Sequence, residues 1–92
     1  MKTKLLIIVS LIVAIDALAG SATWKNSPTS PDWNTAANWT PATVPNGASD
    51  TATFAISSKT RVSLSDNTLV NGIVFEPGAS AFTITVPLDS SL

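Results

Sequence analysis

Two tryptophans, Trp33 and Trp39, are the residues of this chain whose type and spacing most directly suggest ligand binding. Exposed indole rings can stack on sugar rings, and two strand residues share a face when they are an even number apart. These two are six apart, but the intervening "NTAAN" is rich in poor strand formers. Because an indole suits a position at the rim of an apolar core, we expect both rings to cover one end of the fold. Carbohydrate binding at Trp33 and Trp39 is the alternative.

Few residues of the chain are suited to catalysis. It contains no His, Cys or Tyr, which removes most pairs of nucleophile and base, and no serine lies in a G-x-S-x-G turn. Asp50, Asp66 and Glu76 remain as acids of the kind that glycoside hydrolases use in pairs. Each lies beside residues typical of turns. We therefore expect a non-catalytic protein without a cofactor, in which these carboxyl groups form turns.

Neither a metal ion nor a nucleic acid is an expected partner. The carboxylates would suit calcium, but the chain lacks the D-x-[DN]-x-[DN]-G loop and the repeated G-G-x-G-x-D nonapeptide that gather such ligands. After residue 19, three Lys or Arg face five Asp or Glu, a net charge of −2. A nucleic-acid partner is not expected because this part of the chain has no basic patch.

The segment 1–19 has the pattern of a secretory signal peptide. A positively charged start precedes an apolar run over residues 5–15, and an A-x-A motif ends at Ala19. The apolar run is too short for a transmembrane helix, which needs about 20 residues. We expect cleavage after Ala19, with Ala22 as the second choice. The product would be secreted or displayed at the cell surface through a Sec-type pathway, and would meet the membrane only through its signal peptide.

Residues 20–50 form a segment rich in tryptophan and proline. Its four prolines each remove an N–H donor and favour extended backbone in the residue before them, so no long helix is expected. We expect a short strand at "ATWK" (22–25) and short extended pieces around the two later tryptophans. A turn is expected at Asn46-Gly47, because both residue types tolerate positive φ.

From Thr51 onward, apolar residues alternate with a period of two, which predicts strands with one buried face. The runs are "TATFAI", "TRVSL", "NGIVF" and "AFTITV". Their predicted buried positions are Phe54, Ile56, Val62, Leu64, Ile73, Phe75, Phe82, Ile84 and Val86. Short strands at such intervals are typical of a sandwich, a barrel or a β-solenoid.

The size of the chain favours the solenoid. About 73 residues would remain after cleavage, with no cysteine for a disulfide, which is marginal for an independent domain. A sandwich needs about seven strands, and the sequence offers five or six. Solenoids begin with atypical capping units, which matches the segment 20–50. Residues 51–92 would then be the first strand layers of a longer stack.

Six short motifs follow one another in a fixed order: Trp24, Trp33, Asn38-Trp39, "VPNGASDTATF" (44–54), "NGIVF" (71–75) and "FTIT" (82–85). This order resembles the start of bacterial secreted proteins built from autotransporter-associated β-strand repeats. The resemblance covers residues 22 to about 86. It implies a right-handed parallel β-helix, exported and displayed at or released from the cell surface, with a structural or adhesive function. It implies no catalytic residues.

The sequence therefore predicts an all-β protein in three parts: a signal peptide (1–19), a capping segment (20–50) and the first rungs of a right-handed parallel β-helix (51–92). The predicted function is that of a secreted or cell-surface structural or adhesin-like protein, with an extracellular polysaccharide or a cell surface as its partner. Two alternatives remain. One is a small antiparallel β-sandwich that binds carbohydrate through Trp33 and Trp39, and the other is the start of a polysaccharide-degrading β-helix enzyme.

Overall fold

The computed structural model describes residues 19–92. Its elements are β1 (Ala22–Trp24), η1 (Ala36–Asn38), β2 (Trp39–Thr40), β3 (Gly47–Phe54), β4 (Arg61–Ser63), β5 (Val70–Phe75) and β6 (Thr83–Thr85). The expected all-β class is confirmed. The predicted signal peptide lies outside the described residues except for Ala19, which forms an isolated bridge to Val44. No helix within residues 19–92 has the length and hydropathy needed to cross a membrane.

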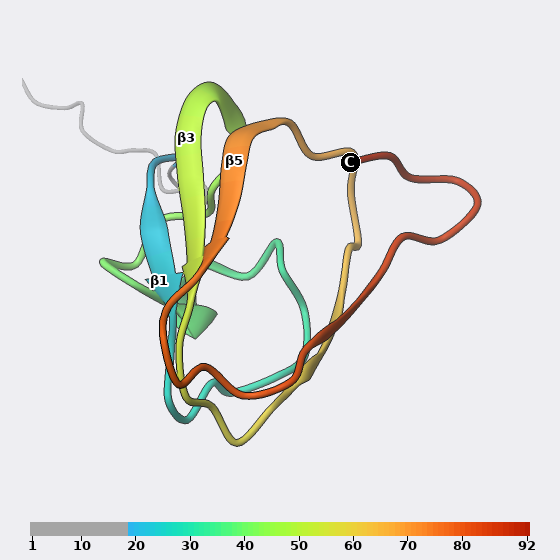
Figure 1. The fold of residues 1–92 in the computed structure, drawn as a ribbon. Coiled ribbons are helices and arrows are strands. Elements are labelled where there is room, and N and C mark those ends of the chain that lie inside the picture. The colour runs from blue at the N-terminus through green and yellow to red at the C-terminus, as the bar shows by residue number, and fades with distance from the viewer. Residues whose placement is uncertain (1–18) are drawn as a thin grey trace, which may run out of the picture.

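The strands form two sheets, one of order β2-β1-β3-β5 and one of β4-β6. Strands β1, β3 and β5 lie side by side (Figure 1) and run parallel to one another. Strands β4 and β6 are also parallel, whereas β2 runs antiparallel to β1. The chain thus makes repeated passes, each along the first sheet and then along the second. An antiparallel sandwich would not pair its strands in this way.

Successive passes keep nearly the same register in both sheets. Ala52 pairs with Ile73 in the first sheet, and Val62 pairs with Ile84 in the second. The chain therefore returns to the two sheets after almost equal lengths. The first return is longer but equally regular, since Ala22 pairs with Ala52 and Asp32 bridges Ser63. Each pass lies along the one before it in both sheets.

Polar side chains join the passes at the corners between strands. The Asn46 side-chain oxygen accepts the Leu69 N–H at 2.9 Å. At another corner the Ser57 N–H donates to the Ser80 hydroxyl at 3.1 Å. At the ends of the short strands, some backbone N–H groups have no partner within the sheet, and these side chains accept their hydrogen bonds.

The core lies between the two sheets. Its buried residues are Ala22, Trp24, Trp33, Trp39, Val44, Ala52, Phe54, Val62 and Leu64. The predicted burial of Phe54, Val62 and Leu64 is confirmed. Ile73, Phe82 and Ile84 are partly buried and pack against this cluster.

Three of the predicted core positions are wrong. Ile56 is 63% exposed, Phe75 is 52% exposed and Val86 is 41% exposed. Strand β3 ends at Phe54, so the alternation that predicted burial of Ile56 no longer applies there. Phe75 and Val86 belong to the last pass or follow it, where no later described strand covers them.

The predicted turn at Asn46-Gly47 is also wrong. Strand β3 already begins at Gly47, and its pairing with β5 shifts register between Gly47 and Thr51. A Cβ at Gly47 would lie 2.9 Å from an Asp50 carboxylate oxygen. The absence of a side chain at Gly47 therefore lets the Asp50 carboxylate approach its backbone. The predicted break at Pro77-Gly78 is a turn, and Gly78 has a φ of 82°.

Candidate functional site: a buried tryptophan cluster and an open apolar face

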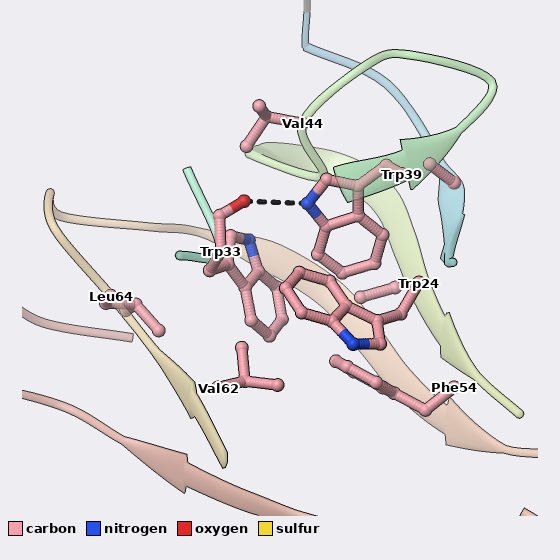
Figure 2. Close-up of a cluster of buried hydrophobic side chains, with 9 residues drawn as sticks. Trp24, Trp33, Trp39, Val44, Phe54, Val62 and Leu64 are labelled. Atoms are coloured by element: carbon pink, nitrogen blue, oxygen red, sulfur yellow. Dashed lines mark hydrogen bonds between the residues drawn. The ribbon is translucent and has the colours of Figure 1, made fainter. Parts of the chain in front are cut away.

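The three tryptophans and Phe54 form one cluster in the core (Figure 2). Trp39 contacts each of the other three rings, with centroid distances of 5.1 Å to Trp24, 5.2 Å to Trp33 and 5.6 Å to Phe54. All three contacts are edge-to-face, the arrangement that aromatic quadrupoles favour. Trp33 and Trp39 come from the capping segment, while Phe54 is the last residue of β3. The cluster therefore packs the capping segment against the sheet that contains β3.

Each indole N–H finds a backbone carbonyl in a different part of the chain. Trp39 donates to the Trp33 carbonyl at 2.7 Å, as the dashed line in Figure 2 shows, and Trp33 donates to the Pro45 carbonyl at 2.9 Å. Trp24 donates to the carbonyl of the distant Lys59 at 2.9 Å. Because buried donors are costly when unpaired, these bonds fix how the rings are oriented.

Asn38 organises the loop before the cluster. The sequence pattern alone assigned it no structural role. Asn38 is fully buried. Its side-chain oxygen accepts the N–H groups of Thr29 and Ser30 at 2.9 and 3.2 Å, and its amide donates to the Asp32 carbonyl at 2.8 Å. An Asn directly before a tryptophan of the core is the sequence signal that could have indicated this role.

Trp33 and Trp39 are both 0% exposed. Neither ring offers a face to solvent, so a sugar has no surface on which to stack at either position. In this structure both rings contribute to packing of the core.

The candidate acids lie on different elements: Asp50 within β3, Asp66 in a bend, and Glu76 directly after β5. The expectation that these carboxyl groups form turns is therefore wrong for Asp50. One Asp50 carboxylate oxygen accepts the Asn46 N–H at 3.2 Å, and one Asp66 oxygen accepts the Asn67 N–H at 2.8 Å. Glu76 is exposed at the end of β5. Among residues 19–92, no three Asp, Glu, His or Cys side chains gather into a group that could hold a metal ion.

The last pass presents an open apolar face, defined here as β5, β6 and the residues that flank them. Its exposed large apolar residues are Leu69, Val74, Phe75, Val86, Leu88 and Leu92. Strands β5 and β6 contain no charged residue. Phe75 stacks on Phe54 with centroids 5.5 Å apart and planes 25° apart, so the aromatic core continues out to this face. Within the described residues, β5 pairs only with β3, and β6 only with β4.

No protein-family model, no curated protein and no solved structure matches this chain. The function has to be inferred from the packing and the surfaces described above.

Proposed function

We propose that this chain is the N-terminal cap and first rungs of a right-handed parallel β-helix, in a secreted or cell-surface protein with a non-catalytic, structural or adhesin-like role. One observation carries the proposal. Strands β3 and β5 pair in parallel, β4 and β6 do the same, and the two pairs have almost equal separations along the chain. Parallel strands that return at a constant interval in two sheets are the pattern of a solenoid.

The difference between the two ends of the sheet supports the capping role of residues 20–50. At one end β2 runs against the direction of the other strands and pairs with β1 over Thr23 and Trp24. The buried tryptophans lie close to this strand, and Trp39 belongs to it. Terminal units of solenoids depart from the repeat in this way because they have to shield the core from water.

The opposite end has the character of a surface that another strand layer covers. Val74 and Phe75 are 47% and 52% exposed on the edge strand β5. Soluble proteins usually protect such edges with charges, prolines or covering segments, because an uncovered apolar edge pairs with other chains. A further rung that paired with β5 and β6 would bury these side chains.

The mass of the native exported product tests this proposal. A mass well above that of residues 20–92 is expected, because further rungs would cover the open apolar face. A mass equal to that of residues 20–92 would contradict the proposal.

A further inference from the structure

A small groove on the surface collects two of the three cationic side chains in the described part of the chain. Lys59 and Arg61 line it together with Pro31, Ser58 and Thr60, and its volume is about 270 Å³. No carboxylate is among the lining residues. The groove therefore carries a local positive charge on a part of the chain whose net charge is −2.

The backbone beneath the groove is held in place by the core. The Lys59 carbonyl accepts the Trp24 indole N–H at 2.9 Å, and the Lys59 N–H donates to the Ser57 hydroxyl at 3.2 Å. The Thr60 carbonyl accepts the Thr83 N–H at 2.8 Å. A ligand would have to order only the side chains, and such preorganisation lowers the entropic cost of binding.

Both cationic side chains of the groove are at least partly accessible to solvent. Arg61 is exposed and Lys59 is half-buried. The acid nearest to the groove in sequence is Asp32, which follows Pro31 but does not line the groove. One of its carboxylate oxygens accepts the Thr35 hydroxyl at 2.6 Å.

We propose that this groove binds the carboxylate of an acidic sugar unit in an extracellular polysaccharide. The Arg61 guanidinium matches a carboxylate with two parallel donors, and Lys59 adds a second positive charge. The hydroxyls of Ser58 and Thr60 both donate and accept hydrogen bonds, as the hydroxyls of a sugar require. The volume of about 270 Å³ lies just below the range for pockets that hold drug-sized ligands, about 300–1,000 Å³, and it suits one sugar unit of a polymer.

This inference names a partner for the adhesin-like role, and it rests on the proposed function in that the partner is extracellular. A single groove of exposed charges binds weakly and loses affinity as salt rises. Repeated acidic units along a polymer raise the overall affinity, because one chain can engage several copies of the protein.

The test is a titration of the exported chain with a fluorescently labelled oligogalacturonate at low salt, followed by anisotropy, with a neutral oligoglucan of equal length beside it. Lys59→Gln and Arg61→Gln are each expected to weaken oligogalacturonate binding about tenfold, as for loss of a charge-assisted contact. Lys25→Gln removes the same charge outside the groove lining and is expected to change binding less than about twofold. Unchanged thermal unfolding shows that each variant is folded.

Three results would overturn the inference. One is failure of the folded chain to bind oligogalacturonate at low salt. Another is an equal loss of affinity in Lys25→Gln and in the groove variants, which would indicate general charge attraction. The third is tighter binding of an oligoglutamate of equal charge, which would indicate an acidic peptide as the ligand. None of these results bears on strand pairing, so the β-helix proposal would stand or fall separately.

Discussion

At the scale of single residues, Trp39 contacts every other ring of the tryptophan–Phe54 cluster. It is fully buried, it contacts two other indoles and Phe54, and its N–H is paired. It contributes to the stability of the fold because it belongs to the capping segment and packs against Phe54 of β3.

Replacement of Trp39 by Ala is expected to lower the free energy of unfolding by about 3–5 kcal/mol, the range for large aromatic truncations in cores. Trp39→Phe keeps part of the ring contacts and should cost less. Ile56→Ala truncates a residue that is 63% exposed and serves as the control. Denaturant unfolding measures all three. A cost for Trp39→Ala no greater than that for Ile56→Ala would show that the cluster does not hold the fold together.

Asn38 has a comparable role through hydrogen bonds. Asn38→Ala would leave the N–H groups of Thr29 and Ser30 without their acceptor, and each such loss costs about 1–3 kcal/mol where the donor is shielded from water. Asn71, which is exposed in β5, provides the matched control as Asn71→Ala. Equal stabilities of the two variants, measured by thermal unfolding, would contradict this role.

At the scale of the elements, the glycines of β3 and β5 differ in the space that surrounds them. Gly47 has no room for a side chain, whereas Gly72 has. Gly47 approaches the Asp50 carboxylate, whereas nothing lies within 4 Å of a Cβ built on Gly72. Gly47→Ala should displace the Asp50 side chain and its hydrogen bond to Asn46, at a cost of about 1 kcal/mol. Gly72→Ala should be neutral or stabilising by up to about 1 kcal/mol, since it restricts the unfolded chain. Denaturant midpoints of the two variants measure the difference, and the reverse order would contradict the close approach of Gly47 to the Asp50 side chain.

The strands were the most predictable elements, because period-two alternation follows from the pleat and needs no tertiary information. This is why the runs that contain Phe54, Val62, Ile73 and Ile84 were placed correctly. The alternation does not indicate where a strand ends. The predicted burial of Ile56 is wrong for this reason, because β3 ends two residues earlier.

Other features depend on residues far apart in sequence and could not be read locally. Asn46 gave a turn prediction because Asn-Gly usually forms a turn, yet its side chain bonds the next pass, at Leu69. The same holds for the groove, since Pro31 and Arg61 meet only once β4 lies beside the capping segment. The absence of His and Cys, in contrast, was visible from composition alone.

At the scale of the whole molecule, the open apolar face predicts self-association of the chain of residues 20–92. Val74→Lys places a charge on the edge strand β5, a device by which natural proteins prevent edge-to-edge pairing. We expect this variant to shift the chain toward monomer in sedimentation velocity. Ile56→Lys introduces the same charge at an exposed apolar position outside β5 and β6 and should leave association unchanged. Equal effects of the two substitutions would argue against the open apolar face as the site of contact.

A disulfide cross-link between β3 and β5 tests most directly whether successive passes stack in parallel. Thr53 and Val74 are partners in the parallel register, and the chain has no cysteine of its own to interfere. We expect the Thr53→Cys, Val74→Cys variant to oxidise to an intramolecular disulfide and to stay folded. The Thr51→Cys, Val74→Cys variant, which joins Val74 to a residue that instead pairs with Gly72, should not. Efficient cross-linking of the second pair in place of the first would contradict the stacked parallel passes from which the proposed β-helix is inferred.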